Sequence, residues 1–210
     1  NVFDFEDDIH TKLPDAIFPN NWISMHHSGE VFYYPMLAKN RRIERREDII
    51  DLLVHEHKFN KNATYEWSKF ETQNLYLEGT GSLVLDHNYR IAYAVNSSRT
   101  SSQLFQKWCQ EMDYYPILFN AKTQEGKEIY HTNVIMSIGE GFVVVCLDVI
   151  SNLKQREALI NLFQKTNKTI IEITEEQMFN YCGNLLQLEN NIGEKVIALS
   201  SRAFDNFSDE

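Results

Sequence analysis

A pattern of two strands followed by a helix recurs four times along the chain, and it constrains the fold more than any other feature. A polar residue leads each copy, and the lead positions are Asn21, Glu78, Asn133 and Asn184. They are 57, 55 and 51 residues apart, although the copies share negligible sequence identity. Repeats at near-constant spacing, each with its own strand pair, favour a propeller-like ring. A doubly wound sheet would instead alternate single strands with helices.

Strands are expected at the short apolar or alternating runs, and helices where apolar residues recur every three or four positions. Thr100 with Gln103, and Thr174 with Gln177, fit the capping box that starts a helix. The expected strands are 22–24, 31–34, 82–85, 91–95, 134–138, 142–147, 169–173, 185–188 and 195–200. The expected helices are 46–57, 101–112, 151–166 and a short one after residue 174.

Charge and composition exclude several classes of function. The 210-residue chain carries a net charge of −10, and acidic residues interrupt its basic cluster between Arg41 and Arg46, so we expect no nucleic-acid partner. No apolar run reaches the roughly 18 residues that span a bilayer, so we expect no membrane partner. Cys109 and Cys146 fall in apolar patterns, and nothing marks Cys182 as activated. Their spacing gives no disulfide framework or metal site, which favours a cytoplasmic protein without a metal or cofactor.

Both ends of the sequence look like cut positions. The chain begins with Asn1 rather than Met, within an apolar–acidic alternation that includes Val2 and Phe3. It stops at Glu210, shortly after a helix-start pattern, and no linker or low-complexity segment interrupts it. We therefore expect residues 1–210 to be a single domain that is truncated at both ends. The sequence carries no pattern that indicates an oligomeric state.

Glu78 and His131 are the strongest candidates for chemistry. Glu78 precedes two glycines, Gly79 and Gly81, that allow close backbone approach. Its carboxylate can hold a cationic or polar head group, or act as an acid or base; the simpler alternative is a solvated loop glutamate. His131 lies just before the third strand pair, and an imidazole can donate and then accept a proton near neutral pH. The simpler alternative is a surface histidine, or a buried one with satisfied hydrogen bonds.

Three further polar residues are candidates for substrate binding. The amides of Asn21 and Asn133 can both donate and accept hydrogen bonds, although each can equally be a turn or capping residue. Arg99 follows the second strand pair, where its guanidinium can bind a substrate carboxylate. The alternative for Arg99 is a helix-flanking arginine paired with a surface acid.

Four motifs occur together in the order of one family, and the resemblance to that family extends over nearly all of the chain. They are FPNNW at Phe18–Trp22, LEGTGSLVLD at Leu77–Asp86, SSRT at Ser97–Thr100 and IYHTNVIMSIGE at Ile129–Glu140. As a set they resemble the amidinotransferase-related branch of the pentein, or arginine deiminase-like, superfamily, and the citrulline-utilization hydrolase type most of all. The resemblance implies an α/β fold, a five-bladed propeller with pseudo-fivefold ββαβ repeats. This chain would supply three to four blades, as an incomplete fragment.

The resemblance also implies a division of chemical roles. In this family a cysteine thiolate attacks the carbon of a guanidino or ureido group. His131 would protonate the departing amine and then activate water, Glu78 would orient the head group, and Arg99 would bind the α-carboxylate. The family's nucleophilic cysteine lies in a glycine-rich stretch near the C-terminus, and no cysteine here matches that motif. We therefore expect the nucleophile to lie outside this chain.

Asn21 and Asn133 depart from the family pattern, because deiminases and amidinotransferases usually carry aspartates at these positions. Burying a guanidinium with Glu78 as the only carboxylate is costly, whereas a neutral ureido group suits two amides. We therefore expect a hydrolase of C–N bonds in ureido or guanidino amino acids, with citrulline favoured over arginine. Two alternatives stay open. One is an amidinotransferase that passes the amidino group to an amine, and the other is a non-catalytic pentein that binds a macromolecule.

Overall fold

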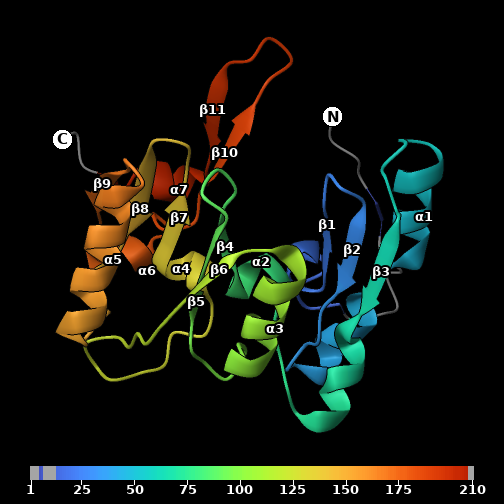
Figure 1. The fold of residues 1–210 in the computed structure, drawn as a ribbon, viewed down its shortest axis with the longest axis horizontal. Coiled ribbons are helices and arrows are strands. Elements are labelled where there is room, and N and C mark those ends of the chain that lie inside the picture. The colour runs from blue at the N-terminus through green and yellow to red at the C-terminus, as the bar shows by residue number, and fades with distance from the viewer. Residues whose placement is uncertain (1–4, 7–12, 208–210) are drawn as a thin grey trace. The chain divides into compact units, whose positions relative to one another are not determined.

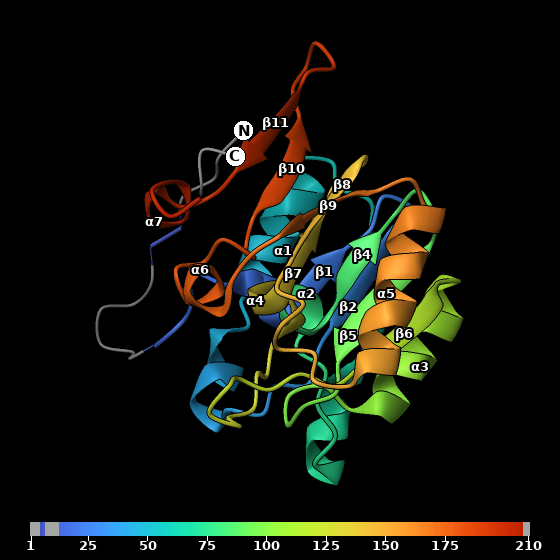
Figure 2. The same cartoon turned by 90° about the vertical axis from the view of Figure 1, so that its left-hand side faces the viewer.

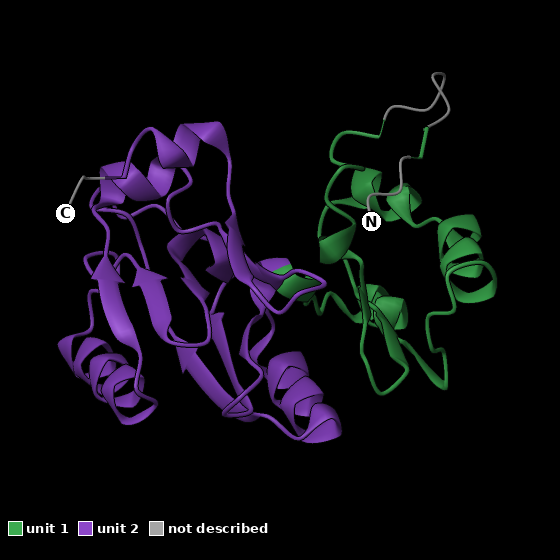
Figure 3. Ribbon diagram, turned by 90° about the horizontal axis from the view of Figure 1, so that it is seen from above, with its two compact units in different colours: residues 1–80 green, residues 81–210 purple. Residues whose placement is uncertain are grey.

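The protein is described by a computed structural model that covers residues 5–6 and 13–207. It divides into two compact units, residues 1–80 and 81–210 (Figure 3). Val2, Phe3 and Glu210, which belong to the expected cut ends, lie outside the described residues, and the single domain stays a prediction. Within the described ranges, no helix is both long and apolar enough to cross a membrane.

The first unit contains one mixed three-stranded sheet. Strand β1 (Ile23–Met25) pairs antiparallel with β2 (Glu30–Tyr33), and β2 pairs in parallel with β3 (Ala63–Glu66). Helix α1 (Glu47–His55) connects β2 to β3 in the chain (Figure 1). The 3-10 helices of this unit are η1 (Pro19–Asn21), η2 (Lys39–Glu44) and η3 (Trp67–Gln73).

The second unit contains two sheets with this same connectivity. In each, an antiparallel pair is followed by a helix and then by a third strand parallel to the second. One copy consists of β4 (Val84–Asp86), β5 (Ile91–Val95), α3 (Ser102–Met112) and β6 (Tyr115–Phe119). The next consists of β7 (Met136–Ile138), β8 (Phe142–Val145), α5 (Leu153–Lys165) and β9 (Thr169–Glu172).

A two-stranded hairpin follows the third copy. It is formed by β10 (Leu186–Glu189) and β11 (Lys195–Ala198), and in Figures 1 and 2 it extends beyond the other elements of its unit. Gln187 on one face accepts a hydrogen bond from the Glu140 backbone at 2.7 Å. The opposite face consists of apolar side chains that are all exposed, namely Leu186, Leu188, Val196 and Ala198. The short helices α6 (Glu175–Phe179) and α7 (Ser201–Phe204) flank the hairpin in the chain.

The sheet connectivity confirms the repeated strand–strand–helix pattern expected from the sequence. Every expected strand and helix is present, with ends that lie within two residues of the expected ones. The third strand of the first copy, β3, and that of the second copy, β6, were not expected. Both lie at sheet edges. β3 is mostly exposed, and β6 contains Pro116 and begins with exposed residues, so neither has the apolar periodicity that marks a strand.

Two short helices stand where the sequence predicted strand residues. Helix α2 (Gly79–Ser82) precedes β4, and α4 (Thr132–Ile135) precedes β7. The expected strands 82–85 and 134–138 therefore begin two residues later. Ile135 is fully buried in its helical turn, and a buried apolar residue in such a turn gives the same sequence signal as one in a strand.

Of the two expected capping boxes, one is present and the other is not. The box of Thr174 and Gln177 is present at the start of α6. The one expected at Thr100 is wrong, because Ser101 is the N-cap of α3 and accepts a hydrogen bond from the Leu104 backbone. Thr100 instead donates its hydroxyl to Ser82, 18 residues earlier, and is fully buried.

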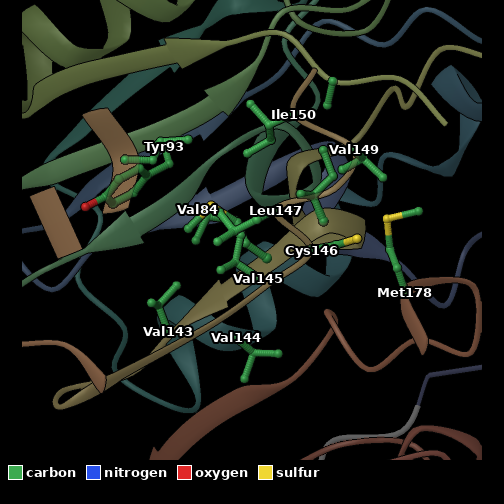
Figure 4. Packing of buried hydrophobic residues seen from close by; sticks show 14 of the residues in the cluster. Val84, Tyr93, Val143, Val144, Val145, Cys146, Leu147, Val149, Ile150 and Met178 are labelled. Atoms are coloured by element: carbon green, nitrogen blue, oxygen red, sulfur yellow. The ribbon is translucent and has the colours of Figure 1, made fainter. Parts of the chain in front are cut away.

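Each unit has its own apolar core. In the first unit the core includes Trp22, Val31 and Ile50. In the second, Val143 and Val145 of β8 pack in one cluster with residues of β4, β5 and α5 (Figure 4). The continuous apolar run that predicted a buried strand at β8 is therefore explained by its position between β7 and β9.

A buried ion pair joins the two sheets of the second unit. Lys168 Nζ lies 3.0 Å from Asp86 Oδ2, and their side chains are 0% and 2% exposed. Lys168 also donates to the backbone oxygens of Gly139 and Glu140, at 2.9 and 2.8 Å. The ammonium group of Lys168, the residue before β9, thus binds both the end of β4 and the β7–β8 turn.

Replacing Lys168 should be strongly destabilising, because Asp86 would remain as an unpaired buried charge. We expect Lys168→Met to lower the free energy of unfolding by about 3–5 kcal/mol, measured by urea denaturation. Lys127→Met is the matched control: Lys127 pairs with Glu125 at 2.6 Å, but its side chain is 76% exposed, so the loss should stay below about 1 kcal/mol. Equal losses in the two variants would contradict this account.

Gly183 should tolerate no side chain. A Cβ at this position would lie 2.4 Å from the backbone oxygen of Val134, so Gly183→Ala must displace helix α4. We expect a loss of about 1–3 kcal/mol in the free energy of unfolding. Gly141→Ala is the control, because a Cβ there meets nothing within 4 Å. An unchanged midpoint for Gly183→Ala would show that α4 yields easily.

Candidate active site

Glu78 is buried in the first unit, and its backbone geometry depends on a glycine. Its side chain is 0% exposed, and one carboxylate oxygen accepts the Leu37 backbone N–H at 3.0 Å. Gly79 has a φ of +42°, and a Cβ there would lie 2.1 Å from the Asn20 backbone oxygen. Only glycine permits this close approach, which explains the Glu-Gly pair of the motif. The reading of Glu78 as a solvated loop residue is therefore wrong.

Asn21 ends η1 and is held by a buried arginine. Its side-chain oxygen accepts a hydrogen bond from Arg41 Nη1 at 2.9 Å, and Asn21 is 5% exposed. Arg41 is itself buried and pairs with the carboxylate of Glu44 at 3.0 Å. Because a guanidinium can only donate, this contact fixes the amide orientation: the oxygen faces Arg41, and the amino group faces away from it.

The motifs of Asn21 and Glu78 contact each other, although they are far apart in the sequence. The backbone of Gly79 packs against that of Asn20, and the Asn20 side chain donates to the Thr80 hydroxyl at 3.2 Å. The first unit thus brings together the segments that carry Asn21 and Glu78. An amide and a carboxylate can between them donate to and accept from a polar head group.

His131 is positioned in the second unit by the residue that follows it. It is the N-cap residue of α4 and is 8% exposed. The Thr132 hydroxyl donates to the Ser82 backbone oxygen at 2.6 Å and accepts the Val95 backbone N–H at 2.8 Å. The opening of the third copy is therefore fastened to the second copy, and the imidazole is fixed next to this contact.

Arg99 is fastened to Ser82, the same residue that Thr132 binds. The Ser82 hydroxyl donates to the Arg99 backbone oxygen at 3.0 Å and accepts from Thr100 at 2.9 Å. The Arg99 guanidinium carbon lies 4.1 Å from the centre of the Tyr130 ring, and the Tyr130 and His131 rings lie 5.0 Å apart. Arg99 and His131 thus both contact the ring of one tyrosine.

A pocket of about 540 Å³ opens beside His131 within the second unit. Apolar side chains from the segment before α4 and from the region of α6 form much of its wall, and charged side chains lie around them. Its lining includes Glu128, Ile129, Tyr130, His131, Met178 and Tyr181. Asn133, in α4, is half-buried and does not line this pocket, and neither does Arg99.

The five candidate residues fall into two groups. Glu78 and Asn21 lie in the first unit, on segments whose backbones contact each other. Arg99 and His131 lie in the second unit, where each contacts Tyr130, and Asn133 is two positions beyond His131. The sequence reasoning missed Arg41 as the partner of Asn21 and Tyr130 as the contact of Arg99. The burial of Arg41 has no sequence signal, because it lies in a run of charged residues that resembles a solvated surface.

The three cysteines are buried, which was expected for Cys109 and Cys146 but not for Cys182, and none resembles a nucleophile. Burial raises the pKa of Cys109 to about 12 and that of Cys146 to about 11, and it also raises the pKa of Cys182. A raised pKa means that the thiol keeps its proton near neutral pH and is unreactive. Over the residues that the structure describes, no cluster of three or more His, Cys, Asp or Glu side chains could hold a metal ion.

Comparison with known families identifies the chain. A family model described as N,N dimethylarginine dimethylhydrolase, eukaryotic, matches residues 1–210. The chain belongs to this family. The search of curated proteins gave no match. The membership in the pentein superfamily that the four motifs indicated is therefore confirmed.

Comparison with solved structures shows that the chain has the pentein fold. The N-terminal domain of ArgZ, a cyanobacterial arginine dihydrolase solved with substrate, matches with a TM-score of 0.64 and 15% identity, over 92% of this chain and 65% of that one. The DDAH from Pseudomonas aeruginosa, solved with citrulline, matches with a TM-score of 0.56 and 16% identity, over 83% of this chain and 58% of that one. The chain thus spans less than two thirds of the length of either structure.

The buried cysteines should resist alkylation in the native protein. At pH 8, a thiol with a pKa of about 11 is ionised to about one part in a thousand, and the fraction rises only as the pH approaches the pKa. We expect iodoacetamide to leave Cys109 and Cys146 unmodified in native protein and to label both in denaturant, as read by peptide mass spectrometry. Rapid native labelling of Cys146 would show that this residue, directly after β8, is not buried.

Proposed function

We propose that the protein containing this chain hydrolyses a C–N bond of a guanidino or ureido amino acid through a cysteine-bound intermediate. The membership in the dimethylarginine dimethylhydrolase family carries the proposal. It is supported by the burial of Glu78 and His131 at the openings of the second and third copies of the repeat. The nucleophile is a cysteine other than the three buried ones.

In the proposed mechanism each group has a defined role, and His131 acts first as an acid and then as a base. The thiolate attacks the guanidino or ureido carbon, and the imidazolium of His131 gives its proton to the departing amine as the C–N bond breaks. Neutral His131 then takes a proton from water, whose oxygen displaces the sulfur and restores the thiolate. Glu78 accepts hydrogen bonds from the head group and orients it, and Arg99 binds the α-carboxylate.

The site amides bear on the choice of substrate. Arg41 holds the oxygen of Asn21, so Asn21 offers its amino group, which is a donor. A donor suits the oxygen of a ureido group better than the N–H groups of a guanidinium, and Asn133 adds no negative charge. We therefore propose citrulline-like amino acids as substrates ahead of arginine-like ones. The family match supports the arginine-like class, so both belong in the assay.

The catalytic roles can be tested by substitution in the full-length protein. We expect His131→Ala and Glu78→Gln each to reduce kcat/KM by about 100-fold or more, because the first removes the acid and base and the second removes the charge that orients the head group. His27→Ala, at an exposed histidine, is the control and should retain full activity. Unimpaired turnover by His131→Ala would refute the mechanism, and unimpaired binding of a macromolecule by it would favour a non-catalytic pentein.

The reaction type and substrate can be tested by product analysis. We expect ammonia or an alkylamine to be released from citrulline, arginine or methylated arginine without an added amine, since water is the proposed acceptor. An amidinotransferase would need an amine acceptor for turnover. Release of ammonia from arginine with citrulline left untouched would show that the proposed ureido preference is wrong.

A further inference from the structure

A short segment of the first unit, residues 34–37, lies between β2 and η2 without regular secondary structure and contacts Glu78. We propose that Glu71 is a positioning residue that acts on Glu78 through this segment. The carboxylate of Glu71 keeps the Glu78 carboxylate in the direction that binds the substrate head group. This inference rests on the proposed function, in which Glu78 orients that group.

Two consecutive backbone N–H groups of the segment donate to two carboxylates. The Met36 N–H donates to Glu71 Oε1 at 2.9 Å, and the Leu37 N–H donates to Glu78 Oε1 at 3.0 Å. The two glutamates therefore bind adjacent peptide planes, which share the Met36 Cα. Because each peptide group is rigid, a shift at the Met36 N–H changes the direction of the N–H that binds Glu78.

Two arginines hold the carbonyl oxygens of the same segment. Arg42 donates to the backbone oxygens of Met36 and Leu37, at 2.9 and 3.4 Å. Arg45 donates to the backbone oxygen of Tyr34 at 2.8 Å. Hydrogen bonds from a charged donor are stronger than those between neutral groups. The segment is thus held by guanidinium groups at its carbonyl oxygens and by carboxylates at its N–H groups.

Glu71 also joins the two arginines to each other. Its carboxylate pairs with Arg42 at 3.1 Å and with Arg45, and the three side chains are only 11% to 23% exposed. Ion pairs that are shielded from water restrain their partners more than exposed pairs do. Removal of the Glu71 carboxylate would therefore break the Met36 contact and release both arginines at the same time.

The other backbone groups of the segment are also occupied. The Tyr34 N–H donates to the Trp22 oxygen at 2.8 Å. Pro35, which has no N–H, accepts the backbone N–H of Leu77 at 3.2 Å, so the residue directly before Glu78 is tied to the segment as well. Every backbone donor and acceptor of the segment therefore has a partner, as buried polar groups require. This pairing fixes the segment in the absence of a helix or strand.

The arrangement gives a role to the basic residues of η2 and its end. Arg41 binds the side-chain oxygen of Asn21, whereas Arg42 and Arg45 bind the segment that contacts Glu78. A basic cluster that resembles a solvated surface in the sequence thus supports both candidate residues of the first unit. Support of this kind keeps a binding group in its productive direction before the substrate arrives.

The test measures Glu71→Ala in the full-length protein, alone and combined with Glu78→Ala, on citrulline, arginine and methylated arginine. Glu47→Ala is the matched control, because the Glu47 carboxylate also accepts a hydrogen bond in the first unit, from the Tyr33 hydroxyl of β2 at 2.8 Å. We expect Glu71→Ala to lower kcat/KM by about three- to thirtyfold, and Glu47→Ala by less than about twofold. In the Glu78→Ala background, Glu71→Ala should cost less than about twofold, because no carboxylate is left to position.

The same factor of loss from Glu71→Ala with and without Glu78 would overturn the inference, since it would indicate a general effect on the fold. An unchanged kcat/KM in Glu71→Ala would also overturn it. If Glu71→Ala does not fold, Glu71→Gln takes its place. Glutamine keeps an acceptor for the Met36 N–H but lacks the charge, and the same pattern is expected at about two- to fivefold.

If the wild-type protein turns over none of the three substrates, the proposed function has failed, and amide hydrogen exchange at Leu37 decides on Glu71. We expect the Glu71 variant to speed exchange of the Leu37 N–H by about tenfold or more, and Glu47→Ala to change it by less than about twofold. A Leu37 exchange rate that is unchanged by the Glu71 variant would overturn the inference.

Discussion

The Thr132 hydroxyl is the contact on which the arrangement of the second unit's candidate residues depends. It is buried and serves two backbone groups at once, the N–H at the end of β5 and the carbonyl at the end of α2. Ser82, whose carbonyl it binds, also holds Arg99 and Thr100 through its hydroxyl. Three motifs that are tens of residues apart are therefore joined by two hydroxyl groups. Valine has the shape of threonine but would leave both backbone groups without a partner.

Close backbone approaches that require glycine occur at two positions within the units. Gly79, before β4, lies against the backbone of Asn20, which belongs to the opening of the first copy. Gly183, before β10, lies in the same way against the backbone of Val134, in the opening of the third copy. Each glycine comes just before a new copy and itself packs on the opening turn of an earlier one. The third copy has no such glycine, and its opening is held by the Thr132 hydroxyl.

Much of this fold could be predicted from the sequence, because most of the first and second strands and the long helices of the copies carry apolar residues in runs or on a regular period. The third strands β3 and β6 could not, since β3 is mostly exposed and β6 contains a proline, which is unusual within a strand. The candidate residues came from motifs, but their partners did not. The contact of Arg41 with Asn21 spans 20 residues and that of Ser98 with Glu128 spans 30, and no local pattern records such contacts. Burial of a charged residue is decided by what the fold places around it.

The apolar face of the β10–β11 hairpin has a consequence for the behaviour of the protein in solution. Leu186, Leu188 and Val196 are 59%, 46% and 45% exposed on one face. An extended strand with an apolar face and unpaired backbone groups at its edge is a template for pairing with another chain. Self-association of this polypeptide would therefore start at the hairpin rather than at the sheets of the second unit's core. The solubility of the polypeptide would therefore depend on whether another surface covers these three apolar side chains.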